Sequence, residues 1–87
     1  SMSDSKATEP VKPIDLRKLP PPEPMLVIMD AIADPVPACG YWAFLLPRFP
    51  QPLVSMLADR GLDYRVEPEE NYAGVLMRIA PEFPEED

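Results

Sequence analysis

Three cationic side chains are the residues of this sequence whose types and spacing best suit ligand binding. Arg17 and Lys18 directly follow one apolar segment, and Arg48 follows another. If the two segments are neighbouring parallel strands, all three side chains lie at their carboxyl ends, where open α/β sheets bind ligands and helix N-termini favour anions. Arg17, Lys18 and Arg48 are therefore the candidate residues of an anion or acidic-peptide site. The simpler interpretation, which we favour, is an ordinary surface contact of Arg17 with Asp15 or Glu23.

The sequence offers no assembled set of catalytic groups. It has no histidine, a single cysteine (Cys39) and no glycine-rich phosphate loop. Asp15 and Glu23 could form an acid–base pair, but a carboxylate near a helix start is favourable without any catalysis. A zinc site of the usual ligands cannot be built within one such chain, and no intramolecular disulfide can form. We expect a non-enzymatic protein without catalytic residues, metal or cofactor, in which Cys39 is a small hydrophobe rather than a redox group.

Composition and charge narrow the classes of partner and compartment. The formal net charge is −7, with 15 acidic against 8 basic residues, whereas binding to nucleic acids or anionic membranes depends on clustered Lys and Arg. The longest apolar run, 41–46, is too short to span a bilayer, and no segment resembles a signal peptide. A single cysteine suits a reducing compartment. We expect a soluble cytoplasmic protein that binds neither nucleic acid nor membrane.

Fourteen prolines divide the chain into short elements, and none interrupts an apolar run. Two helices are predicted from apolar stripes, one of Met25, Ile28, Met29 and Ile32 and one of Leu53, Met56 and Leu57. Gly61 is expected to form the left-handed cap of the second helix. Strands are predicted at 12–16, 40–46, 62–66 and 73–79. The order β-α-β-α-β-β therefore fills one domain at 12–79.

Two tails flank this domain. Residues 1–11 are polar and are expected to be disordered, with Ser1 before Met2 as a cloning remnant. Residues 80–87 are acidic and are expected to form a second disordered tail.

Residues 15–24 form the one distinctive motif and read Asp-Leu-Arg-Lys-Leu-Pro-Pro-Pro-Glu-Pro. Between a strand and a helix, this resembles the signature of the TusA/SirA-like sulfur carriers, Asp-x-x-Gly-Leu-x-Cys-Pro-x-Pro. The matching residues are Asp15, Leu19, Pro22 and Pro24. The motif is more similar still to that of an uncharacterised bacterial branch of the superfamily, Asp-Leu-Arg-x-Leu-Pro-Pro-Pro-Glu-Pro. Lys18 replaces the glycine of the carriers, and Pro21 replaces their cysteine.

The resemblance implies an α+β two-layer sandwich, in which a mixed four-stranded sheet of order 1-2-4-3 carries two helices on one face, as right-handed crossovers require. It does not imply sulfur transfer by this chain, because proline cannot carry a persulfide. Cys39 is expected at the opposite sheet edge from position 21, roughly 20 Å away, and so cannot substitute. The branch has Leu-Pro-His before its second helix where this chain has Leu46-Pro47-Arg48, so that histidine is absent too.

The segment Tyr41 to Leu46 provides a second candidate site. Its side chains alternate between the two faces of a strand, and only one set can face the helices. Without a third layer, the other set leaves an open apolar face for a protein partner or a second copy of the chain. The candidate residues of this face are Tyr41, Trp42, Phe44, Leu45 and Leu76.

Three functions follow from these sites. The first is a non-enzymatic protein-interaction domain of the TusA/SirA-like fold. The second is a domain that senses a small anion or metabolite through Arg17 and Arg48. The third is a sulfur-relay accessory protein without a reactive thiol of its own.

Overall fold

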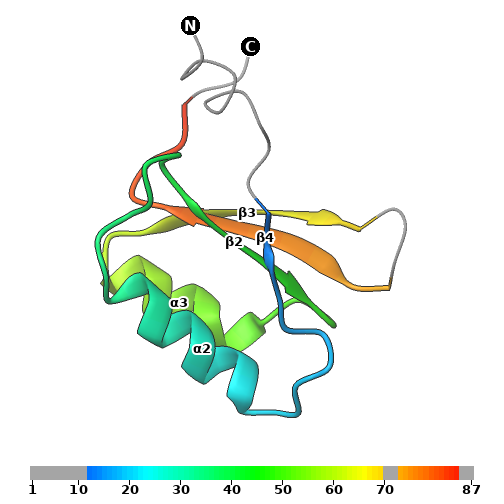
Figure 1. The fold of residues 1–87 in the computed structure, drawn as a ribbon. Coiled ribbons are helices and arrows are strands. Elements are labelled where there is room, and N and C mark those ends of the chain that lie inside the picture. Colours follow the sequence, from blue (N-terminus) through cyan, green and yellow to red (C-terminus); the bar gives the residue numbers. More distant parts are fainter. Residues whose placement is uncertain (1–11, 70–72, 85–87) are drawn as a thin grey trace, which may run out of the picture.

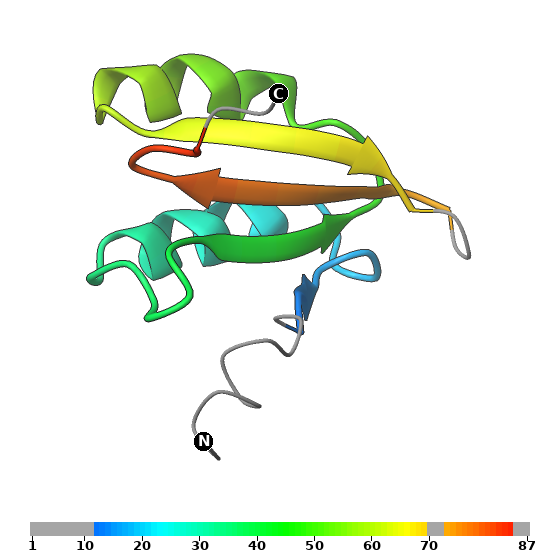
Figure 2. The same ribbon diagram turned by 90° about the horizontal axis from the view of Figure 1, so that it is seen from above.

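A computed structural model places four strands and two helices within residues 12–69 and 73–84, the part of the chain that is described here. In chain order these are β1 (Ile14–Asp15), α2 (Glu23–Ile32), β2 (Trp42–Leu46), α3 (Gln51–Asp59), β3 (Asp63–Pro68) and β4 (Val75–Ala80). The strands form one sheet in the order β1-β2-β4-β3. β1 runs parallel to β2, whereas β4 is antiparallel to both β2 and β3. Both helices cover the same face of the sheet (Figures 1 and 2), which confirms the predicted α+β sandwich.

Prolines start both helices. α2 follows Pro22 and has Pro24 in its first turn, and α3 follows Pro50 and has Pro52 in its first turn. Proline is well suited to these positions, because the first N–H groups of a helix have no partner within the helix. Neither helix is long and apolar enough to cross a membrane.

The end of α3 has the cap that the sequence predicted. Gly61 has a φ of +71°, its N–H donates to the carbonyl of Ala58 at 3.0 Å, and the N–H of Leu62 donates to the carbonyl of Leu57 at 2.9 Å. This pair of hydrogen bonds defines a Schellman motif. The cap turns the chain directly into β3.

The core lies between the helices and the inner face of the sheet. Trp42 and Phe44 of β2 are 9% and 0% exposed, so their prediction as residues of the open face is wrong. Antiparallel register pairs Phe44 with Met77 of β4, which is also fully buried. Directly opposed residues share a face of a sheet. The remaining buried apolar residues of the core are Leu16, Ile28, Ile32, Leu46, Leu53, Leu57 and Ile79.

The ends of the strands differ from the predicted bounds. β1 has only two residues and pairs only with β2, through Ile14 opposite Phe44 and Asp15 opposite Leu45. Leu16 continues into the core at 3% exposure, whereas Ile14, two residues earlier, is 47% exposed. β4 extends to Ala80, one residue past the predicted domain boundary. The predicted tail at 1–11 lies outside the described residues.

Candidate functional site

The sheet face away from the helices carries fewer of the predicted apolar residues than expected. Leu45 and Leu76 are directly opposed on β2 and β4 and are half-buried. Tyr41 lies beneath Arg78, whose guanidinium carbon is 5.8 Å from the centroid of its ring. Arg78 also donates a hydrogen bond to a carboxylate oxygen of Glu67 at 3.0 Å. The face is therefore a mixture of one leucine pair with charged side chains.

The segment after β4 contacts this same side of the sheet. The guanidinium carbon of Arg65 is 4.7 Å from the centroid of the Phe83 ring, and its Nη2 donates to the carbonyl of Pro84 at 2.7 Å. Arg65 is opposite Arg78 in the β3–β4 register, so both lie on the face away from the helices. Residues 83 and 84, predicted to be part of a disordered tail, thus contact the sheet. Residues 85–87 of that predicted tail lie outside the described residues.

The predicted cationic cluster is divided between two places. Arg17 pairs with Asp15: its Nε donates to Oδ1 at 2.8 Å and its Nη2 to Oδ2 at 2.6 Å. These hydrogen bonds hold the pKa of Asp15 well below its ordinary value. Arg17 and Lys18 line one hollow together with Asp15 and Ala73. Arg48 lines a different pocket. The pairing of Arg17 with Asp15 confirms the surface contact that the sequence favoured.

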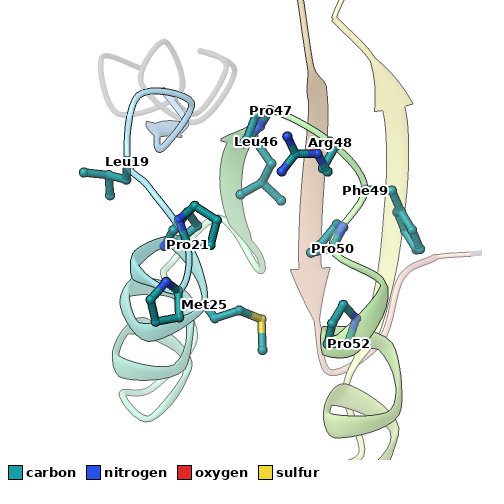
Figure 3. Close-up of a pocket in the computed structure, with 11 residues that line it drawn as sticks. Leu19, Pro21, Met25, Leu46, Pro47, Arg48, Phe49, Pro50 and Pro52 are labelled. Atoms are coloured by element: carbon teal, nitrogen blue, oxygen red, sulfur yellow. The ribbon is translucent and has the colours of Figure 1, made fainter.

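Arg48 borders a pocket of about 260 Å³ between the first turns of the two helices (Figure 3). The pocket lies beyond the carboxyl end of β2, at the sheet edge where the sequence predicted a site. Six of its eleven lining residues are prolines and four more are apolar. They are Leu19, Pro21, Pro22, Pro24, Met25, Leu46, Pro47, Arg48, Phe49, Pro50 and Pro52.

The helix start at α3 offers this pocket few hydrogen-bond donors. The N–H of Gln51 donates to the carbonyl of Phe49 at 3.0 Å, and the N–H of Leu53 donates to the carbonyl of Pro50 at 2.9 Å. Pro52 between them has no N–H. An anion site built from free N–H groups at this helix is therefore absent. The charge at the pocket comes from Arg48 alone, since it is the one ionisable residue of the lining.

Arg48 is exposed and lies at the rim of the pocket. In Figure 3 its side chain extends from the loop after β2 toward the space between the two helix starts. Within residues 12–69 and 73–84 it has no hydrogen bond or ion pair. The first turn of α3 contains no acidic residue. A carboxylate brought to this rim would thus meet a cation that no neighbouring described residue neutralises.

Two positions bear on sulfur chemistry. Pro21, where the sulfur carriers have cysteine, lines the pocket. Cys39 precedes the amino end of β2, whereas the pocket follows its carboxyl end, so Cys39 is not part of the lining. Cys39 is exposed and its Sγ donates to the carbonyl of Tyr41 at 3.1 Å. Its prediction as a small packed hydrophobe is wrong, because the turn before β2 lies outside the sandwich.

Several lining residues were not predicted as site residues. Met25 was predicted only as part of the apolar stripe of α2, and it packs against the core and also lines the pocket. Leu19 was predicted only as a residue of the motif, and Phe49 was not singled out. The one sequence feature shared by both sides of the pocket is the recurrence of prolines at 20–24 and 47–52, each between a strand and a helix. In parallel βα units both such junctions lie at the same sheet edge.

No three histidine, cysteine, aspartate or glutamate side chains in the described part of the chain come together as a metal ion would need. No protein-family model, curated protein or solved structure matches the chain. The likeness of residues 15–24 to the TusA/SirA-like signature therefore stays a prediction. The functional argument rests on the geometry of the pocket and the charge at its rim.

Proposed function

We propose that this chain is a non-enzymatic protein-interaction domain of the TusA/SirA-like type, which docks an apolar side chain of a partner protein between its two helix starts. The observation that carries this proposal is the pocket itself, apolar on all sides except at Arg48. Its position at the carboxyl edge of a sheet is where α/β proteins bind ligands. We place the protein in the cytoplasm, where the exposed thiol of Cys39 stays reduced.

The size of the pocket favours one side chain over a larger ligand. Its volume of about 260 Å³ lies below the ~300–1,000 Å³ of typical small-molecule sites. A single aromatic or long aliphatic side chain fits such a volume. Burying one contributes about 1.5–3 kcal/mol, which is the contribution expected of a central anchor in a protein interface.

The proline walls support binding for a second reason. A proline side chain loses almost no conformational entropy when it is buried, whereas a flexible side chain at an interface costs about 0.5–1.5 kcal/mol to order. Six of the lining residues are prolines, so docking costs little side-chain conformational entropy in the pocket itself. The lining also contains no hydroxyl, thiol or carboxylate, which supports a binding role rather than a catalytic one.

The other predicted functions have less support. Anion sensing by Arg17 and Arg48 together is weakened by the pairing of Arg17 with Asp15. A sulfur-relay role is weakened by Pro21 at the thiol position. Self-association through the open sheet face is weakened by the charged side chains of Arg78 and Glu67, which lie on the same face as the Leu45–Leu76 pair.

A matched pair of adjacent substitutions tests the proposal. Met25 lines the pocket, whereas Leu26 beside it on α2 is 57% exposed and does not. Wild type, Met25→Lys and Leu26→Lys are each used as bait in native lysate, and retained proteins are quantified by mass spectrometry. Thermal unfolding first establishes that all three are folded. We expect partners to be retained by wild type and Leu26→Lys and lost by Met25→Lys.

Two outcomes of this experiment would contradict docking at the pocket. If Met25→Lys keeps every partner, and Leu45→Asp on the open sheet face loses them, docking occurs at the sheet and the pocket has no part in it. A loss with both lysine variants would indicate a general effect of charge on α2 and would also contradict the proposal.

A further inference from the structure

The charge at the pocket rim restricts what can dock there. Arg48 is a cation in a chain of net charge −7, and it stands at the edge of an otherwise apolar lining. A neutral side chain in the pocket would leave the Arg48 guanidinium without an ion-pair partner. An apolar group that also carries a negative charge would satisfy both parts of the site, because guanidinium binds carboxylates through two parallel hydrogen bonds.

The dimensions of the pocket restrict the ligand further. The volume admits about one side chain, and Arg48 lies at the rim rather than at the bottom. The negative charge must therefore lie close to the main chain of the docking residue. An internal residue has no charge there, whereas the last residue of a chain carries its side chain and its α-carboxylate on the same Cα atom. Binding of a C-terminal carboxylate is a known mode of peptide recognition, although other proteins use backbone N–H groups for it.

The electrostatic surroundings agree with a carboxylate. Arg48 is the one charged residue of the lining, and no ion pair within the described residues neutralises it. The first turn of α3 has no acidic residue to repel a bound carboxylate, and Glu23 in the first turn of α2 is exposed and not part of the lining.

We propose that the pocket recognises the C-terminal residue of a partner protein, with its apolar side chain between the helix starts and its α-carboxylate on Arg48. This inference rests on the proposed function, since it names the part of the partner that the pocket binds. It predicts a preference for chain ends over internal apolar residues, and for bulky over small last residues.

Unlabelled peptides and calorimetry test it. The probes are N-acetylated Gly-Ser-Gly-Ser-Phe as the free acid, the same peptide as a C-terminal amide, and Gly-Ser-Gly-Ser-Ala as the free acid. We expect the amide to bind about fivefold more weakly, the upper end for an exposed ion pair. The alanine peptide should lose about tenfold or more, because the buried aromatic side chain is missing.

Two substitutions of Arg48 show whether this residue binds the carboxylate of the peptide. In Arg48→Gln the acid and the amide should bind equally, whereas Arg48→Lys should keep part of the preference. The matched control is Arg60→Gln, an exposed arginine at the other end of α3, which should keep all of it. Equal binding of acid and amide to wild type, or an undiminished preference in Arg48→Gln, would overturn the inference.

A last experiment distinguishes binding of a protein C-terminus from binding of a free small-molecule acid. N-acetylphenylalanine presents the same side chain and carboxylate without the preceding residues. Binding as tight as that of the peptide would mean that the site reads a small acid, and the assignment to a protein terminus would be wrong. Failure of all peptides would also overturn the inference, whereas the docking proposal stands or falls separately on Met25→Lys in the capture experiment.

Discussion

Replacing Gly74 with alanine should destabilise the protein far more than the same change at Gly61. Gly74 precedes β4 with a φ of +119°, and a β-carbon there would overlap the carbonyl oxygen of Leu46. The overlap is between main-chain positions of adjacent strands, so no side chain can turn aside to relieve it. Holding a non-glycine residue in so sparsely populated a conformation costs about 1–3 kcal/mol. Overpacking adds about 1–3 kcal/mol.

Gly61 is the control because it has the conformation without the contact. Its φ is +71°, and a β-carbon there would meet no atom within 4 Å. Alanine at position 61 would therefore be destabilised only by the left-handed backbone conformation, which costs about 1–2 kcal/mol. The two costs at Gly74 add to about 2–6 kcal/mol, a large part of the ~5–15 kcal/mol by which native proteins are stable.

The single tryptophan provides the assay. Trp42 is 9% exposed in the core, so thermal unfolding can be followed by its fluorescence. Each kcal/mol lost from the free energy of unfolding should lower the melting temperature by about 4–8 °C in a domain of this size. We expect a fall of at least about 8 °C for Gly74→Ala, from the same scaling. Equal effects of the two substitutions would refute the argument from the contact with Leu46.

Three further outcomes follow from the structure. Trp42→Asp should abolish the cooperative unfolding transition, whereas Tyr41→Asp on the opposite face should leave the far-ultraviolet circular dichroism spectrum native; a folded Trp42→Asp would mean that the faces of β2 are assigned wrongly. The lowered pKa of Asp15 contributes stability above about pH 4, the usual value of an unfolded aspartate, and this is lost as the pH falls below it. Urea midpoints of Asp15→Asn should therefore change less than those of wild type between pH 5 and pH 2.5, and parallel curves would contradict this. Cys39→Ser should change stability by less than about 0.5 kcal/mol, as for most surface sites; a sulfur atom gained at Cys39 from a persulfide donor and passed to an acceptor, detected by mass spectrometry, would contradict a non-carrier role.

The sequence predicted the order of elements because apolar periodicity and proline placement are local signals. The i, i+3, i+4, i+7 stripe located α2, and Gly61 located the end of α3. The pairing of Arg17 with Asp15 was among the predicted alternatives, since the two residues are only two positions apart. Each of these features depends on neighbours in the chain.

Features that depend on distant segments were harder to predict. Both alternating sets of 41–46 are apolar, so nothing within β2 shows which set faces the helices. The register with β4 decides it, because Arg78 lies opposite Ala43 and marks the outer face, while Met77 lies opposite Phe44. The pocket likewise depends on how closely two helix starts approach each other. The prolines that line it appeared in the sequence only as boundaries between elements.

The proline walls also determine which spectroscopic experiments can detect occupancy of the pocket. Proline has no amide proton, so six of the eleven lining residues give no signal in amide-detected nuclear magnetic resonance and none in hydrogen exchange. Only the five other lining residues can report a bound ligand through their amides, so these spectra contain few signals from the pocket. The methyl groups of Met25, Leu19 and Leu46 are the natural reporters, because these residues line the same pocket and their methyl carbons can be enriched in carbon-13. Screening for the partner of this domain should therefore begin with methyl spectra.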